Sequence, residues 1–257
     1  MNKKEFKKTI PILNGWIHSP CTLSAEILAS SKFNSITIDL QHGMLDFNEC
    51  RGILQVLGKY NIYPIVRVPS NETDIINKCL DAGAKGIICP LINTVEDCEK
   101  FLESCFYPPF GIRSFGPTLA SLNQTNYFIK SKSETTTIIM LETRESVLNL
   151  SKILTLKLLD VIYIGPFDLS ISYGTSPNEI FKNKEMIKTY KDVLTKVKKA
   201  KKIAAIHCIS AETAIKFLRM GFDLVTVSTD MGLLKKSLDE EQNRIIDFMQ
   251  NFKSNSS

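Results

Sequence analysis

The chain has three histidines, and each stands at the end of a short apolar run of the kind that forms a buried strand. His18 follows ILNGWI, His42 lies in IDLQHG, and His207 ends IAAIH. Gly43 permits a tight turn after His42, so that this imidazole can project from the end of its strand. There it can act as a general base near neutral pH. A hydrogen-bonded structural histidine is the alternative.

Two acidic residues are placed in the same way. Glu142 follows TTTIIML, and Asp168 follows VIYIGPF. Neighbouring carboxylates that face one opening repel each other, and a bound divalent cation relieves that repulsion. Oxygen ligands favour Mg²⁺ or Mn²⁺ with several waters retained. The alternative is that both side chains only cap the helices that follow.

Arg67 ends the segment PIVRVPS, where Pro69 fixes the chain behind it. A guanidinium at this place suits a substrate carboxylate or a developing oxyanion, although a buried pair with an acid such as Asp39 would also satisfy it. No lysine lies on the apolar runs, which argues against Schiff-base chemistry. The motifs GxGxxG, GK[ST], GxSxG and HExxH are also absent.

The elements that must position these residues follow a regular order. Short β-branched runs alternate with amphipathic stretches, as in βα units around a parallel sheet. Their number in 257 residues predicts a (β/α)₈ TIM barrel, an α/β fold, as a single domain over 1–257. In that fold the loops after the strands build the active site. The expected strands are Ile12–Ile17, Ser35–Asp39, Pro64–Val68, Gly86–Pro90, Thr137–Leu141, Val161–Gly165, Ile203–His207 and Leu224–Ser228.

Helix signals support this order, because Glu72–Ala82 and Ala211–Met220 carry apolar residues three and four positions apart. Phe106–Lys132 is the longest irregular stretch, and we expect it to be a functional loop on the active face. Lys253–Ser257 is expected to be a disordered tail. The expected N-caps are Asn71, Thr94, Thr143 and Ser210, and the expected helix-ending glycines are Gly83 and Gly221.

The composition of the chain limits the kind of protein it can be. The chain is 44% hydrophobic and 23% charged, as in an ordinary globular protein. The net charge of +5 is too small and dispersed to indicate nucleic acid, and no apolar run approaches a membrane span or signal peptide. The seven cysteines show no CxxC spacing and read as core residues in a reducing compartment. We therefore expect a cytoplasmic protein with no nucleic-acid or membrane partner.

A set of segments occurs in a characteristic order and spacing: IDLQHG, PIVRVPSN, LDAGAKGIICPLINTVEDC, YPPFGIRSFGP, MLETRESVLNL, IGPFDLS and FDLVTVSTDMGLL. Together they resemble the HpcH/HpaI aldolase family, the metal-dependent class II pyruvate aldolases close to the citrate-lyase β-subunit and malyl-CoA lyase group. The resemblance covers roughly Gly15–Leu234. It implies cleavage of a 4-hydroxy-2-oxo acid to pyruvate, or a related 2-oxo acid, and an aldehyde. It also implies a homohexamer in which the C-terminal helix, here Leu233–Asn251, is exchanged between subunits.

The resemblance assigns roles to individual residues. It makes His42 the catalytic histidine, Asp81 the acid that orients it, and Arg67 the holder of the substrate's carboxylate and keto oxygen. Glu142 and Asp168 would hold the divalent metal, Mg²⁺, Mn²⁺ or Co²⁺. The remaining substrate contacts would come from Gly165, Pro166, Phe167, Arg113 and His207.

Two positions depart from the family pattern. Gln41 stands where members often have Glu, and Met140 stands where many have Gln. A thioether cannot donate the hydrogen bond of an amide, so the contacts near Glu142 must differ, and His207 and Arg113 are donors that could replace it. Two other functions stay open: an acyl-thioester lyase or citrate-synthase-like condensing enzyme of the same superfamily, and a noncatalytic binding barrel.

Overall fold

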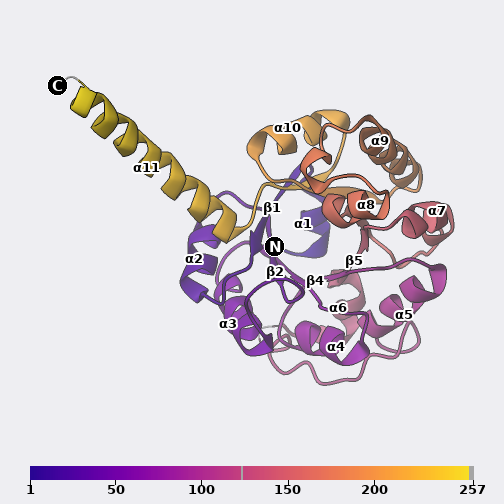
Figure 1. The fold of residues 1–257 in the computed structure, drawn as a ribbon. Coiled ribbons are helices and arrows are strands. Elements are labelled where there is room, and N and C mark those ends of the chain that lie inside the picture. Colours follow the sequence, from indigo (N-terminus) through magenta and orange to yellow (C-terminus); the bar gives the residue numbers. More distant parts are fainter. Residues whose placement is uncertain (123, 255–257) are drawn as a thin grey trace.

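The computed structural model describes residues 1–122 and 124–254 and shows a closed barrel of eight parallel strands in sequential order. In Figure 1 the helices surround the strands as an outer ring. The predicted (β/α)₈ barrel is confirmed. The strands are β1 (Ile12–Ile17), β2 (Ser35–Asp39), β3 (Tyr63–Arg67), β4 (Gly86–Cys89), β5 (Thr136–Leu141), β6 (Val161–Ile164), β7 (Ile203–His207) and β8 (Leu224–Thr226).

Helices connect successive strands, and one further helix lies at each end of the chain. The helices are α1 (Lys3–Lys8), α2 (Thr22–Ser30), α3 (Phe47–Leu57), α4 (Thr73–Asp81), α5 (Val95–Cys105), α6 (Tyr127–Glu134), α7 (Arg144–Ile153), α8 (Pro166–Ser172), α9 (Lys184–Lys199), α10 (Ala211–Met220) and α11 (Asp230–Ser254), with a 3₁₀ turn, η1, at Pro177–Glu179. Residues 253–257 were expected to form a disordered tail. Helix α11 includes residues 253 and 254, and residues 255–257 lie outside the described residues.

Local capping signals were correct at most helix ends. Thr94, Thr143 and Ser210 each accept a hydrogen bond from the N3 backbone, forming capping boxes, and Gly221 ends α10 in the left-handed conformation. Asn71 was wrong as a cap. Glu72 occupies the N-cap of α4 without a side-chain bond, because the Asn71 amide instead donates to the carbonyl of Asp97 at 2.9 Å.

The expected position of the long loop, on the active face directly after a strand, was also wrong. Helix α5 separates it from β4, so the loop follows a helix rather than a strand, and residues 127–132 belong to α6. The loop is fixed to its neighbours: Ile112 N donates to the Glu103 carbonyl at 2.8 Å, and Leu119 N donates to the Asp81 carbonyl at 3.1 Å. It therefore lies against α4 and α5, away from the strand ends that carry the site residues.

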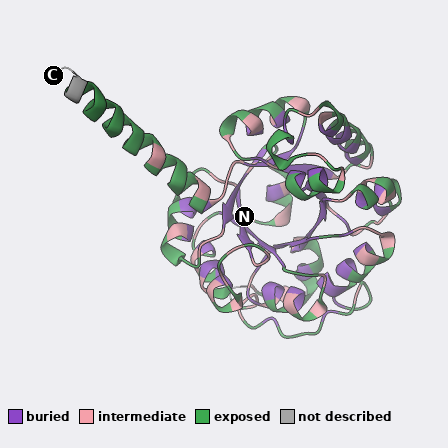
Figure 2. Ribbon diagram, viewed as in Figure 1, coloured by how far each residue is buried: buried purple, intermediate pink, exposed green. Residues whose placement is uncertain are grey.

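Two apolar layers hold the barrel together. The larger packs the outward faces of the strands against the helices, and the smaller fills the barrel interior. Phe6 of α1 belongs to the interior layer and stacks on Tyr63, with ring centroids 4.3 Å apart. The burial colouring of Figure 2 shows these strands almost entirely buried. Burial of this kind fixes the strands and, with them, the residues at their ends.

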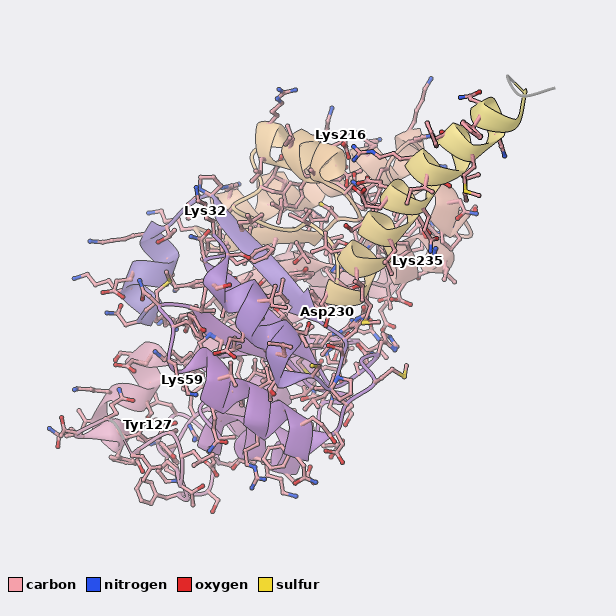
Figure 3. All side chains as sticks on the ribbon, turned by 90° about the vertical axis from the view of Figure 1, so that its left-hand side faces the viewer. Lys32, Lys59, Tyr127, Lys216, Asp230 and Lys235 are labelled. Atoms are coloured by element: carbon pink, nitrogen blue, oxygen red, sulfur yellow. The ribbon has the colours of Figure 1, made fainter. Side chains whose placement is uncertain are left out.

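Helix α11 projects away from the barrel (Figure 1) and is exposed along nearly its whole length (Figure 2). It begins at Asp230, which Figure 3 shows at the end of the helix nearer the barrel, and it contacts β1. The Asp230 carboxylate accepts hydrogen bonds from His18 N at 2.9 Å and Ser24 Oγ at 2.8 Å. None of the helices in the described part of the chain is both long and apolar enough to cross a membrane.

Candidate active site

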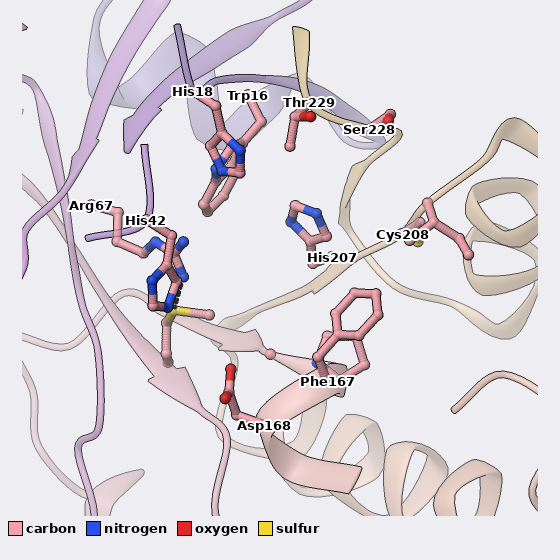
Figure 4. A pocket seen from close by; sticks show the side chains of 14 residues that line it. Trp16, His18, His42, Arg67, Phe167, Asp168, His207, Cys208, Ser228 and Thr229 are labelled. Atoms are coloured by element: carbon pink, nitrogen blue, oxygen red, sulfur yellow. Dashed lines mark hydrogen bonds between the residues drawn. The ribbon is translucent and has the colours of Figure 1, made fainter. Parts of the chain in front are cut away.

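A pocket of about 380 Å³ opens at the carboxyl ends of the strands, and all three histidines of the chain line it. This is the end of a TIM barrel at which catalytic residues converge, and the volume lies within the range of small-molecule sites. Figure 4 shows His18 and Asp168 on opposite sides, with His207 between them. The lining residues are Trp16, His18, His42, Arg67, Met140, Gly165, Pro166, Phe167, Asp168, His207, Cys208, Ile209, Ser228 and Thr229.

Arg67 is held by a bidentate ion pair with Asp39. The two residues pair directly in the register of β2 and β3. Arg67 Nε donates to Asp39 Oδ1 at 2.8 Å, and Nη2 donates to Oδ2 at 2.5 Å. Both side chains are buried, and the guanidinium also lies 5.0 Å from the Trp16 ring centroid. The guanidinium is therefore fixed in place, and its Nη1, which makes only a weak contact with the Met140 sulfur at 3.5 Å, can still donate to a ligand.

Asp39 is the hub of this arrangement. In addition to the bonds from Arg67, its carboxylate accepts a hydrogen bond from Trp16 Nε1 at 3.1 Å and lies 2.8 Å from His18 Nε2. It also accepts from the backbone N–H groups of Gln41 and His42, at 3.0 and 3.2 Å. Burial opposes ionisation, but the hydrogen bonds from His18 and Arg67 hold the pKa of Asp39 far below its ordinary value. One ionised carboxylate thus orients residues from β1, β2 and β3.

The turn after β2 places His42 at the pocket. Gly43 N donates to the Asp39 carbonyl at 3.1 Å. A Cβ at Gly43 would lie 2.2 Å from that same oxygen, so only glycine fits this turn. The sequence prediction of a tight turn here is confirmed.

Asp81 and Arg113 do not line this pocket within one chain. Arg113 Nη2 donates to Asp81 Oδ1 at 2.6 Å and to the Tyr127 hydroxyl at 3.0 Å, and its side chain is buried. Asp81 faces a separate hollow that is also lined by Arg51 and Lys78. The structure therefore pairs Asp81 with Arg113 and does not bring it to His42.

Glu142 and Asp168 approach each other beside Gly165. Burial, together with the charge of Asp168, raises the pKa of the Glu142 carboxyl, although Leu91 N donates to Glu142 Oε1 at 2.6 Å. A Cβ at Gly165 would lie 2.9 Å from Glu142 Oε2, so this glycine, which lines the pocket, leaves room for the buried Glu142 carboxylate behind it. Asp168 lies exposed in the first turn of α8 and lines the pocket.

The two carboxylates suit a magnesium-type cation. No group of three or more His, Cys, Asp or Glu among the described residues is arranged to hold a metal. Mg²⁺ commonly takes one or two carboxylates and completes its shell with water and substrate. Burial is the main cause of the raised pKa of Glu142, and the charge of Asp168 adds to it; a cation between the two carboxylates would relieve that repulsion.

His207 stands on the pocket floor as a neutral imidazole. Burial, and then the positive charge of Arg67, lowers the pKa of His207 to about 3. Its Nδ1 lies 3.3 Å from the Tyr163 hydroxyl, and its ring packs edge-on to Trp16 with centroids 4.9 Å apart. His207 can therefore form hydrogen bonds with a ligand, but it does not carry a charge near pH 7.

Both departures from the family pattern lie beside these residues. Met140 lines the pocket, and its Sδ lies 3.5 Å from Arg67 Nη1 as a weak acceptor. The Gln41 Oε1 is buried without a hydrogen-bond partner among the described residues. The sequence reading gave no role to Trp16, His18, Ser228 or Thr229, although His18 stood at a strand end like the residues it did select.

Known proteins resemble the chain over most of its length. The family described as HpcH/HpaI aldolase/citrate lyase matches residues 15–237. A hydroxypyruvate/pyruvate aldolase from Rhizorhabdus wittichii is 36% identical over 225 residues, covering 87% of this chain and 90% of the relative. A 4-hydroxy-2-oxo-heptane-1,7-dioate aldolase from Shigella flexneri is 28% identical over 241 residues, covering 92% and 90%.

Solved structures share the fold. A family member from Burkholderia cenocepacia superposes with a TM-score of 0.87 at 23% identity, over 92% of this chain and 95% of that one. The citrate synthase SbnG gives a TM-score of 0.86 at 23% identity, over 97% and 99%. At this identity the likeness extends to the barrel and no further.

Proposed function

We propose that this chain, which belongs to the HpcH/HpaI aldolase/citrate lyase family and is a carbon–carbon lyase, cleaves a 4-hydroxy-2-oxo acid to pyruvate, or a related 2-oxo acid, and an aldehyde. The observation that supports the proposal is a single pocket that is lined by the fixed cation Arg67 and by Asp168, with the buried carboxyl of Glu142 close enough to Asp168 to feel its charge. Arg67, together with a cation held by the two carboxylates, can bind and polarise a 2-oxo acid.

Glu142 and Asp168 are the residues that would hold the divalent cation, and Mg²⁺, Mn²⁺ and Co²⁺ all suit oxygen ligands of this kind. When bound, the cation supplies positive charge for the carboxylate of the 2-oxo acid and for the enolate that its cleavage produces. Gly165 keeps the space that Glu142 needs. Pro166 and Phe167 line the pocket beside them and would contact the substrate.

Arg67 would contact the keto oxygen of the substrate. Asp39 already holds its Nε and Nη2, so Nη1 is the donor that meets the negative charge as it develops. Because the ion pair exists before the substrate arrives, little reorganisation is needed during the reaction.

His42 would take the proton of the 4-hydroxyl group while the bond between C3 and C4 breaks. The electron pair of that bond passes to the enolate, the C4–O bond becomes the aldehyde carbonyl, and a proton returned to C3 completes the 2-oxo acid. His207, neutral near pH 7, would donate or accept a hydrogen bond instead of moving this proton. Asp81 would act on His42 only in an assembled oligomer, since within one chain it ends α4 just before β4, toward the opposite end of the barrel from His42.

The compartment and assembly belong to the same proposal. Six free cysteines are buried and one, Cys21, is exposed, which supports a reducing compartment such as the cytoplasm. The exposed helix α11 supports a homo-oligomer, a hexamer with exchanged helices.

Exchange of the pyruvate methyl protons with D₂O tests the proposal without knowledge of the aldehyde. The wild-type protein with Mg²⁺ or Mn²⁺ should show exchange by NMR, because enolate formation is half of the proposed reaction, and EDTA should abolish it. Arg67→Ala should slow exchange by about a hundredfold, since it removes a charge-assisted contact.

The matched control is Arg219→Ala, which removes an exposed arginine from the last turn of α10, outside the pocket. It should leave the exchange rate within about twofold of wild type. Absence of metal-dependent exchange in folded, metal-supplemented protein would contradict the aldolase proposal and turn attention to the thioester-lyase and noncatalytic alternatives.

A further inference from the structure

One wall of the pocket has no part in the reaction proposed above. It consists of His18, after β1, and of Ser228 and Thr229, after β8. Figure 4 shows these side chains across the pocket from Asp168. A 2-oxo acid held between Arg67 and the two carboxylates would therefore present its other end, the aldehyde portion, toward this wall.

The contact of His18 with Asp39 determines which ring nitrogen remains for a ligand. His18 Nε2 lies 2.8 Å from Asp39 Oδ2. Asp39 is ionised and can only accept, so Nε2 must carry the hydrogen. No hydrogen bond joins Nδ1 of His18 to any residue that the structure describes. In the neutral imidazole Nδ1 is then an acceptor that needs a donor.

The wall also offers a hydroxyl group that can donate. Thr229 Oγ1 accepts from Gly232 N at 3.0 Å, which leaves its own hydrogen free for a ligand. Asp230 ties the wall together, because its carboxylate accepts from the backbone of His18 at 2.9 Å and from Ser24 Oγ at 2.8 Å. The acceptor on His18 and the donor on Thr229 thus stand on a jointly fixed surface.

We infer that His18 is a specificity-determining residue that selects aldehyde partners with a hydroxyl group on the carbon next to the carbonyl. This inference rests on the proposed function. The ligand hydroxyl donates to His18 Nδ1 and accepts from Thr229, which satisfies both side chains. An alkyl aldehyde of the same size leaves Nδ1 unpaired, and such a loss weakens binding of the wrong partner.

Two substitutions test the roles of the two ring nitrogens of His18 separately. In His18→Gln the side-chain amide reaches the position of Nε2, so the bond to Asp39 is kept and the acceptor at Nδ1 is lost. In His18→Asn the amide oxygen stands near the position of Nδ1, so the acceptor is kept and the bond to Asp39 is lost. The two variants therefore distinguish a role of His18 in binding the aldehyde from a role in positioning Asp39 and Arg67.

The readout is the ratio of kcat/KM for glycolaldehyde to that for propionaldehyde in the addition of pyruvate. These aldehydes differ by a hydroxyl in place of a methyl group, and their intrinsic reactivities cancel when variants are compared. We expect the ratio to fall about tenfold in His18→Gln and to stay near the wild-type value in His18→Asn. The pyruvate exchange rate is measured alongside for every protein.

The outcomes are distinct. A wild-type protein without pyruvate exchange overturns the proposed function and this inference with it. Normal exchange with an unchanged ratio in His18→Gln overturns this inference alone. A ratio that falls in His18→Asn but not in His18→Gln shows that His18 acts through Asp39, which also overturns it. A His18-dependent preference for glyoxylate over glycolaldehyde would assign the wall to a carboxylate and reject the hydroxyl.

Discussion

At the scale of single residues, the site depends on a carboxylate that the substrate need not touch. Asp39 is fully buried, yet it stays ionised because Arg67, Trp16, His18 and two backbone N–H groups all point at it. A buried charge without such partners would cost several kcal/mol. The hub is therefore a positioning device: it holds Arg67 and the turn at His42 in place before a substrate binds.

Glu142 gives the sharpest test at this scale. Glu142→Gln removes one of two negative charges from the proposed metal site while it keeps the shape of the side chain. We expect the dissociation constant for Mn²⁺ to rise about a hundredfold, as measured by calorimetry or by the EPR signal of free Mn²⁺. The control Glu145→Gln neutralises an exposed residue of α7 and should bind Mn²⁺ as wild type does. Equal affinity in the two variants would reject Glu142 as a ligand.

The sequence identified most of the site residues because strand ends converge in a barrel. His42, Arg67, Asp168 and His207 were selected at strand ends or just beyond them, and all four line the pocket. Asp39 appeared only as a possible partner for Arg67, since its role as a hub depends on the register of β1, β2 and β3. The separation of Asp81 from His42 follows from the order of the elements, because Asp81 ends α4 just before β4 and so lies toward the amino ends of the strands, where Arg113 binds it.

At the scale of elements, the sequence predicted the barrel and most strand and helix ends, but it did not indicate contacts between residues far apart in the chain. Strands β1, β2 and β7 have the predicted bounds, and capping boxes mark three predicted helix starts. The role of α1 depends on contacts between distant residues, and no sequence pattern indicated it. Phe6 fills the barrel interior against Tyr63, while Lys3 and Lys7 both reach Asp160 at 2.6 Å. Helix α1 thus closes the end of the barrel opposite the pocket.

Asp160 binds α1 to the barrel, so we expect its substitution to lower the stability of the fold. Its side chain is largely buried, and it also accepts from Thr137 N at 3.1 Å. Asp160→Ala leaves the nearly buried Lys3 ammonium with the Thr135 carbonyl but without a charged partner, so we expect the free energy of unfolding to fall by about 3 kcal/mol in a urea titration near pH 7. The control Lys7→Ala removes a more exposed partner and should cost less than about 1 kcal/mol. A smaller loss for Asp160→Ala than for Lys7→Ala would contradict this view.

The ion pairs of Asp160 with Lys3 and Lys7 also predict how the stability of the fold changes at acid pH. Burial opposes ionisation of Asp160, but Lys3 and Lys7 hold its pKa below the ordinary value. A carboxyl with a lowered pKa in the folded state stabilises the fold fully above about pH 4, and this contribution is lost as the pH falls through the lowered value. The difference in unfolding free energy between wild type and Asp160→Ala should therefore shrink below about pH 4. A difference that is constant down to about pH 2 would contradict the ion pair.

At the scale of the whole molecule, the two ends of the barrel are separated in function. The pocket opens at the carboxyl ends of the strands, and α1 closes the other end. Helix α11 belongs to neither, although Asp230 ties its first turn to the wall that carries His18. Any partner that holds α11 would therefore also steady that wall of the pocket.

The apolar side of α11 leads to the prediction of assembly. Leu234, Leu238, Ile245 and Met249 lie at helical spacing, and each is about half exposed or more. A helix of 25 residues is about 37 Å long, and its apolar residues gain no burial from the barrel of the same chain. We expect light scattering at micromolar concentration to give about six times the mass of one chain, 28.9 kDa.

The double substitution Leu238→Glu and Ile245→Glu should lower that mass, because it places two charges in the surface that a neighbouring subunit would bury. The control Gln242→Glu adds one charge to an exposed polar position of the same helix and should keep the wild-type mass. Circular dichroism checks that all three proteins keep their folded barrel. A wild-type monomer, or an oligomer that the double substitution leaves intact, would exclude α11 as the element that joins the subunits.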